Sequence, residues 1–139
     1  GTLDTQILIM ATHMQNLLTH KRFIVDRCLV DGLCYTRYLY NNLKEENLGD
    51  MRWFMDYCER LVENYILEYT KIFYIPSEIP IQDDGVRSTN PSFHTQIVTL
   101  FERNIEYFTY LNPKLFITVR GSVEERVAMV LETVRQLEE

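Results

Sequence analysis

Three short apolar segments, separated by amphipathic stretches, constrain the fold of this chain of 139 residues more than any other feature. They are residues 23–25 (FIV), 71–75 (KIFYI) and 115–119 (LFITV). Each run is too short for a helix and apolar on both faces, which is typical of a strand inside a parallel sheet. Strands that alternate with helices predict an α/β fold, in which helices cover both faces of a three-layer parallel sheet.

The stretches between these segments have apolar side chains at steps of three and four residues, which predicts helices. Three such helices are expected over residues 3–20, 28–43 and 50–69. Ser92 is expected to N-cap a fourth helix, which Asn112 and Pro113 end.

The last helix is expected to begin at Ser122, because Ser122 and Glu125 have the spacing of a capping box. Its apolar positions are expected to form a buried stripe along one face. These positions are Val123, Val127, Val130, Val134 and Leu137. The length of the chain predicts that all these elements belong to one domain, residues 1–139.

The charge balance and the cysteine pattern narrow the class of protein. A net charge of -6 and a pI of about 5.1 disfavour unaided binding to nucleic acid or to an anionic membrane. No run approaches the roughly 18 apolar residues of a transmembrane helix, and the first residues lack the features of a signal peptide. Cys28, Cys34 and Cys58 form no CxxC pair, which favours buried free thiols in a reduced, cytoplasmic protein.

Polar clusters follow all three predicted strands. Asp26 and Arg27 follow the first, a long loop over residues 76–92 that contains Arg87 follows the second, and residues 120–122 (RGS) follow the third. Ligands of parallel sheets bind beyond the carboxyl ends of the strands. The three clusters are therefore expected to face one crevice.

The chain contains neither of the standard loops that cradle phosphate. Glycine stands only at positions 1, 32, 49, 85 and 121, so no GxGxxG and no GxxxxGKS/T motif occurs. Either the fold does not bind nucleotides, or the part that would bind them precedes residue 1.

Three segments of the chain nevertheless resemble P-loop nucleoside and nucleotide kinases. RFIVDRCLVDGLCYTRYLY is similar to their strand followed by Asp-Arg, QDDGVRSTNPSFHTQI to their lid, and LFITVRGSVEERVAMVLETV to their closing strand, turn and helix. The family that the chain resembles most is the AAA-type predicted ATPase/kinase family, which contains ribosylnicotinamide-kinase-like domains. The similarity spans about residues 4–137, with the segments in the family's order.

The resemblance implies a function for the complete protein that this chain alone would lack. It implies a nucleotide-binding transferase that uses ATP and magnesium to phosphorylate a small nucleoside, nucleotide or nicotinamide-riboside-type molecule. The P-loop of that family lies before the point that matches residue 1, so we expect roughly 30–60 further residues upstream, the length of a βαβ unit. The chain by itself is expected to be catalytically inert.

The resemblance also implies catalytic roles for Asp26, Arg27 and Arg87. Arg27 and the lid residue Arg87 would steady the phosphates, and Asp26 would hold a magnesium-bound water. The alternative for Asp26 and Arg27 is a simple salt bridge at a strand end. The alternative for Arg87 is a surface arginine without a role.

Two further pairs of residues are implied to bind small molecules. Asp31 and Tyr35, one helical turn apart on the face that carries Arg27, would border the acceptor pocket; their alternatives are a solvated carboxylate and a core tyrosine. Gly121 and Ser122 would pass the adenine base; their alternative is a plain N-cap.

A rival hypothesis is a non-enzymatic interaction module on the same α/β scaffold. It would use the aromatic-rich helices, above all residues 53–65, to hold a protein partner or a second copy of the chain in a homo-oligomer.

Overall fold

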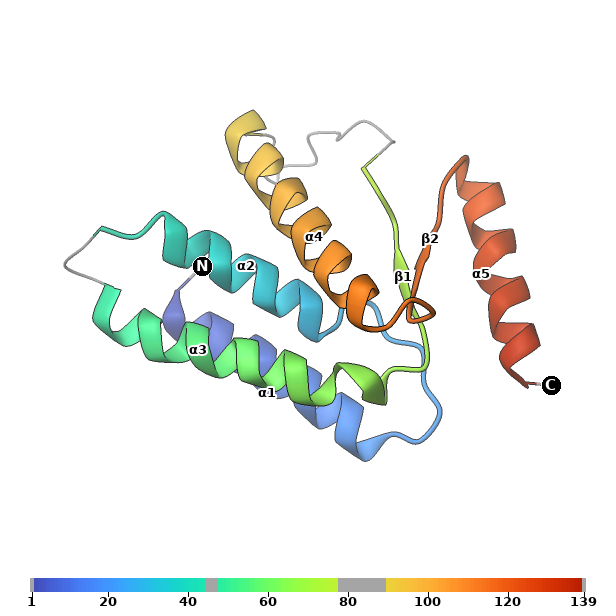
Figure 1. Ribbon diagram of the computed structural model, residues 1–139, viewed down its shortest axis with the longest axis horizontal. Helices are drawn as coiled ribbons and strands as arrows, with labels where there is room; N and C mark the ends of the chain where they lie inside the picture. The colour runs from blue at the N-terminus through green and yellow to red at the C-terminus, as the bar shows by residue number, and fades with distance from the viewer. Residues whose placement is uncertain (1, 45–47, 78–89, 139) are drawn as a thin grey trace.

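The computed structural model describes residues 2–44, 48–77 and 90–138 (Figure 1). Helices account for 72% and strands for 5% of these residues. The elements, in chain order, are α1 (Leu3–Thr19), α2 (Leu29–Asn41), α3 (Leu48–Tyr65), a 3-10 turn η2 (Ile66–Glu68), β1 (Ile72–Tyr74), α4 (Pro91–Leu111), β2 (Phe116–Thr118) and α5 (Val123–Glu138). Within the described ranges, no helix combines the length and apolarity needed to cross a bilayer.

The predicted three-layer parallel sheet is wrong, because the described chain forms a mainly helical fold with one two-stranded sheet. β1 and β2 pair in parallel with Ile72 opposite Phe116, and α4 connects them. Residues 23–25 form no strand, and the Ile24 side chain is 77% exposed. A strand needs a neighbour that satisfies its backbone N–H and C=O groups, and this segment has none among the described residues.

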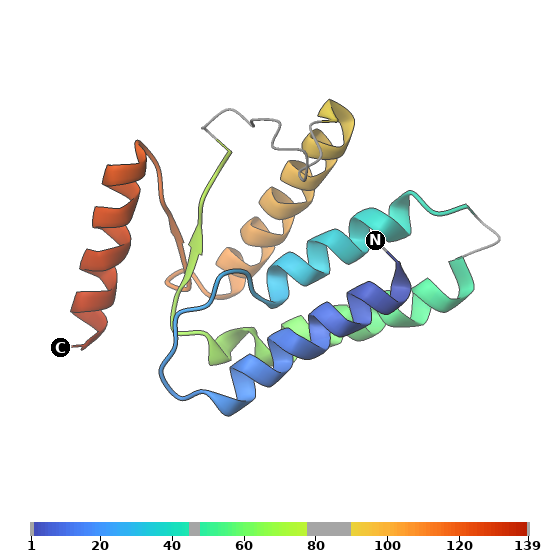
Figure 2. The same ribbon diagram turned by 180° about the vertical axis from the view of Figure 1, so that it is seen from behind.

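Helices pack on helices instead of on the faces of a sheet. α1, α2 and α3 lie against one another, and α4 packs on α2 (Figures 1 and 2). Side chains from all four helices, and the turn after α3, fill the core between them. The most deeply buried are Met10, Leu29, Cys34, Phe54, Cys58 and Val62. The apolar periodicity of the first three helices was therefore a signal for a helical core rather than for sheet coverage.

The N-cap of α4 differs from the predicted one. Asn90, not Ser92, caps α4: its side-chain oxygen accepts the N–H of Ser92 at 2.9 Å and that of Phe93 at 3.4 Å. Pro91 then occupies the first turn, where its missing N–H removes no helical hydrogen bond. The predicted end of α4 is confirmed, since Asn112 is its C-cap.

The last helix, α5, begins as predicted but does not bury its apolar stripe. The capping box is present: the Ser122 N–H donates to Glu125 at 3.1 Å, and the Glu125 N–H donates to the Ser122 hydroxyl at 3.1 Å. Val123 is 62% exposed, and Val127 and Leu137 are exposed as well. Both ribbon views show α5 beside β2, on the side away from α1, α2 and α3 (Figures 1 and 2). Val130 and Val134 of the same stripe are half-buried, so the described elements cover the predicted apolar face only in part.

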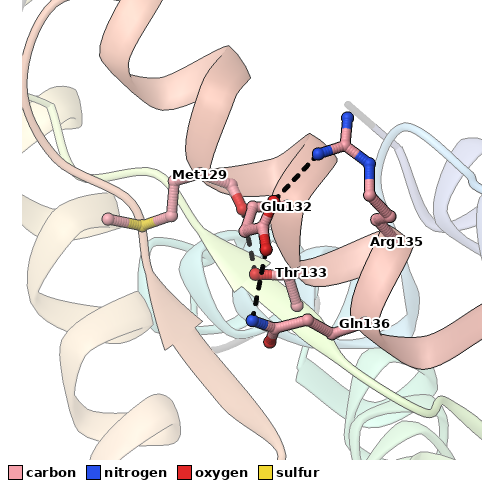
Figure 3. Close-up of polar contacts among 5 residues, drawn as sticks. All are labelled: Met129, Glu132, Thr133, Arg135 and Gln136. Atoms are coloured by element: carbon pink, nitrogen blue, oxygen red, sulfur yellow. Dashed lines mark hydrogen bonds and ion pairs between the residues drawn. The ribbon is translucent and has the colours of Figure 1, made fainter. Parts of the chain in front are cut away.

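Four side chains in the second half of α5 form contacts within the helix itself (Figure 3), whereas Glu138 at its end pairs with Arg22 at 3.6 Å. Arg135 donates to Glu132 at 3.0 Å, Gln136 donates to the same carboxylate at 3.4 Å, and the Thr133 hydroxyl donates to the Met129 carbonyl at 2.9 Å. These contacts span three or four residues, so they stabilise the helix without attaching it to the rest of the fold.

Candidate functional site

A cavity of about 800 Å³ lies among the start of α2, β1 and the first half of α4. Its lining consists of Asp26, Arg27, Cys28, Val30, Asp31, Tyr35, Ile72, Phe73, Tyr74, Ile75, Ser77, Phe93, His94, Ile97, Val98, Phe101, Ile105 and Phe116. Four residues of the predicted site, namely Asp26, Arg27, Asp31 and Tyr35, are thus brought to one cavity. A largely apolar cavity with a few convergent polar groups is the usual form of a small-molecule site.

The polar edge of the cavity is organised by Asp31. One carboxylate oxygen accepts the N–H of Cys28 at 2.9 Å and so caps the start of α2, while the other accepts from the Arg27 guanidinium at 3.1 Å. Arg27 itself has a positive φ of 75°, which is uncommon for a residue with a Cβ. The partner of Arg27 is therefore Asp31, one helical turn away, and not Asp26 as the simple salt-bridge alternative supposed.

The electrostatic balance of this edge follows from that pairing. Burial would lower the pKa of Arg27, but the hydrogen bond and the charge of Asp31 outweigh it, so the pKa of Arg27 lies above its ordinary value. Asp26 is exposed and makes no hydrogen bond or ion pair with any residue that the structure describes. The Arg27 guanidinium is thus hydrogen-bonded to Asp31, and the charge of Asp26 acts on it as well.

Aromatic rings form the wall opposite this edge. The Tyr35 ring lies 6.3 Å from the Phe93 ring and 6.1 Å from the Phe101 ring, centroid to centroid. On β1, burial raises the pKa of Tyr74; the charge of Glu102 raises it further and that of Arg120 opposes the shift. Rings at these separations are in contact with one another, so together they give this side of the cavity an aromatic surface.

The sequence did not single out the residues that α4 and the end of β1 contribute. Ser77 follows β1 and His94 lies in the first turn of α4, and their side chains are joined by a hydrogen bond of 3.2 Å between Oγ and Nε2. Phe93 was expected on the inner side of its helix, and Phe101 was not singled out. Ser77 lies at the start of the long loop and His94 just after its end, and this position was the available signal, because the two ends of a loop can meet.

The cysteine in the cavity is not a nucleophile. Cys28 is buried, and burial together with the charge of Asp31 raises the pKa of its thiol to about 12. Cys34 and Cys58 are buried and free as well, which confirms the prediction of buried thiols. The thiolate is the reactive form, so the raised pKa values disfavour reaction of these groups.

The remaining predicted site residues lie elsewhere. Gly121 and Ser122 do not line the cavity; Gly121 has a φ of 101° that favours glycine, and its carbonyl accepts from Arg126 Nε at 2.8 Å. Both residues thus shape the start of α5, and their predicted contact with an adenine base stays a prediction. Arg87 lies outside the described residues, so its predicted role in a lid stays a prediction.

ATP and magnesium were expected for the complete protein, and that expectation stays a prediction. Within the described ranges, no group of three or more carboxylate, histidine or cysteine side chains could hold a metal, and the sequence contains no phosphate-cradling loop. Comparison with known proteins adds no assignment: no family model, curated protein or solved structure matches this chain.

Proposed function

We propose that this chain binds a small aromatic molecule that accepts a phosphoryl group, as the acceptor-binding part of an ATP-dependent small-molecule kinase. The observation that supports the proposal is the convergence of Asp26, Arg27, Asp31 and Tyr35 on one cavity. They are the residues to which the resemblance assigns acceptor binding and phosphoryl transfer.

Each group has a defined task in this proposal. The aromatic wall, including Tyr35, holds the ring of the acceptor and excludes water from it. Asp31 orients Arg27 through their hydrogen bond, and Arg27 presents at the edge the planar guanidinium that suits contact with a phosphate. Asp26, next to it, presents a carboxylate that can accept a hydrogen bond from an acceptor hydroxyl.

The chain alone is expected to be unable to transfer phosphate, because it has no loop that could hold the triphosphate. The purified chain, incubated with ATP, magnesium and a panel of nucleosides, should form no phosphorylated product and no ADP above the level of a boiled sample. Phosphoryl transfer by this chain would overturn the proposal that it binds the acceptor but cannot hold the triphosphate.

Ligand binding is tested directly by titration calorimetry with nucleosides. Tyr35→Leu removes the ring but keeps an apolar side chain, and it should weaken binding about tenfold, in line with the roughly 1–3 kcal/mol that stacking on one aromatic residue contributes. Tyr110→Leu is the matched control, because Tyr110 is 84% exposed on the same chain and does not line the cavity. Equal affinity of the two variants, both folded by circular dichroism, would contradict the proposed site.

A second candidate, self-association, is favoured by the apolar surface that the described elements leave uncovered. Trp53 and Tyr57 are exposed on α3 with ring centroids 6.5 Å apart, and α5 exposes Val123 and Val127. The accessible surface of 9811 Å² also exceeds the about 7,600 Å² that scaling gives for a compact monomer of this mass. Light scattering during gel filtration tests this candidate at about 100 μM, a concentration at which weak complexes form. A dimer that becomes a monomer in the double variant Trp53→Ser, Tyr57→Ser would support self-association. A monomer of the unchanged chain at this concentration would oppose it.

A further inference from the structure

One side of α5 carries an uncovered apolar strip. Val123, Val127 and Leu131 follow one another at steps of four residues, so they lie on one side of the helix. Each of these side chains is more than half exposed. A single exposed valine or leucine needs no explanation, but an unbroken row along a helix is a surface that another element can cover. We call these three residues the α5 strip.

The neighbouring side of α5 faces the rest of the fold. Val130, Thr133 and Val134 are half-buried, and Arg126 is buried, with its Nε donating to the Gly121 carbonyl at 2.8 Å. A partner on the α5 strip would leave these contacts in place. Figures 1 and 2 show α5 on the far side of β2 from α1, α2 and α3, so it lies at the edge of the described fold, where a second molecule can reach it.

Two charges of opposite sign border the α5 strip on the same edge. Glu124 lies in the first turn of α5 and Arg135 in the last, about three helical turns apart. Residues separated by whole turns project from the same edge of a helix. Arg135 already contacts Glu132 at 3.0 Å, but both groups are exposed, so this ion pair contributes little. The guanidinium has five N–H donors and can bind a second carboxylate as well.

An antiparallel pair of α5 helices matches these charges. A twofold axis across the strip places the start of one helix against the end of the other and brings the same edge of both helices together. Glu124 of each chain then lies opposite the partner's Arg135. The same register places Val127 opposite the partner's Leu131, because the midpoints of both pairs fall next to Met129. A parallel pair would instead set like charges against one another, which is unfavourable.

The exposed area of the chain is large enough for such an interface. The chain exposes 9811 Å², about 2,200 Å² more than the roughly 7,600 Å² that scaling gives for a compact monomer of its mass. A specific interface of ordinary size removes about 600–1,000 Å² from each partner. The excess therefore exceeds what a second copy of the chain needs to cover.

We propose that two copies of this chain associate through the α5 strip as an antiparallel helix pair, with Glu124 of each chain bound to the partner's Arg135. This inference rests on self-association, the second candidate above, and it assigns the contact to α5. The exposed Trp53 and Tyr57 on α3 are the alternative surface. Acceptor binding is independent of the inference, since no residue of α5 lines the cavity.

Charge reversal tests the pairing in the full chain. Sedimentation equilibrium between about 2 and 200 μM should show a monomer–dimer equilibrium for the unchanged chain. Glu124→Arg and Arg135→Glu should each weaken dimerisation about tenfold or more, because each sets like charges opposite one another at both symmetric contacts. The two changes combined in one chain should restore the dissociation constant to within about threefold, since the pair is then inverted. Both changes oppose the helix dipole, so an effect through the stability of α5 would instead grow in the combination.

Substitutions in the strip itself supply the second measurement. Val127→Ser with Leu131→Ser should abolish the dimer over this concentration range. Met129→Ser is the matched control, because Met129 is exposed on the opposite side of α5 and should leave the dimer intact.

Three results would overturn the inference. A dimer that Trp53→Ser with Tyr57→Ser dissociates, and that the α5 variants leave intact, would overturn it and leave the second candidate standing. Charge reversals that the combination does not rescue would overturn the antiparallel pairing. A monomer over the whole concentration range would overturn both this inference and the second candidate.

Discussion

The contact between α1 and α2 allows one substitution to be worked through in detail. Gly32 lies on α2 and faces α1, and a Cβ built on it would fall well inside van der Waals contact with the Met10 sulfur. Met10 is 1% exposed, so its side chain cannot move into solvent to relieve the overlap. We therefore predict that Gly32→Ala destabilises the fold.

Two effects of opposite sign set the magnitude. Alanine is a better helix former than glycine by about 1 kcal/mol in a helix interior. An extra methyl group in a close-packed core costs about 1–3 kcal/mol, since neighbouring side chains are forced from their rotamers. The second effect should win because the sulfur of Met10 is enclosed, which leaves a net loss of about 1–2 kcal/mol in the free energy of unfolding.

Urea unfolding followed by circular dichroism measures this loss, and Gly49→Ala supplies the control. A Cβ on Gly49 would meet nothing within 4 Å, so this change in α3 should be neutral or stabilise the fold by up to about 1 kcal/mol. Met10→Ala combined with Gly32→Ala should cost less than the sum of the two single changes, because the shortened side chain makes room for the methyl group. A stabilised Gly32→Ala variant, or strict additivity of the pair, would refute the packing argument.

Three other outcomes follow from local contacts. Asp31→Ala should lower the free energy of unfolding by about 1–2 kcal/mol, mostly through the lost cap of α2, since the ion pair with a 59% exposed guanidinium adds little; a loss below about 0.5 kcal/mol in urea unfolding would contradict this. The hydrogen bonds from Ser122 lower the pKa of Glu125, so their contribution to the stability of α5 is present above the ordinary pKa of 4.5 and is lost as the pH falls through the lowered pKa. Circular dichroism should show the helicity of the wild type falling in this acidic range, with a smaller change in Ser122→Ala. Burial raises the pKa values of Cys28 and Cys58 to about 12 and about 11, so the native chain at pH 8 should react with a disulfide reagent far more slowly than the urea-unfolded chain, and equal rates would show that these thiols are accessible.

The sequence determined those features that depend on neighbouring residues alone. The periodicity of apolar side chains predicted α1, α2 and most of α3, and the capping box placed the start of α5 at the right residue. The runs at 71–75 and 115–119 correctly predicted two strands. Helical hydrogen bonds and caps form within four residues of chain, so the sequence around each element contains the information that specifies it.

The same local signals failed where an element depends on a partner elsewhere. Residues 23–25 have the composition of a strand but no neighbouring strand among the described residues to pair with. The stripe of α5 has the spacing of a buried face, but Val123, Val127 and Leu137 on it are exposed. Composition and spacing state what a segment could bury. Only the tertiary structure decides whether another segment is there to cover it.

One part of the candidate site could likewise be predicted from neighbouring residues, and the other part could not. The spacing of Arg27, Asp31 and Tyr35 predicted that they act together, and Arg27 does bond to Asp31, although Arg27 precedes α2 and does not share its face. The aromatic wall, and the hydrogen bond between Ser77 and His94, form because α4 packs against α2 and β1. Phe93, for example, comes about sixty residues after Tyr35 in the chain. The sequence thus determined which polar groups stand together at the start of α2, whereas long-range packing decided that they border a cavity and which rings close it.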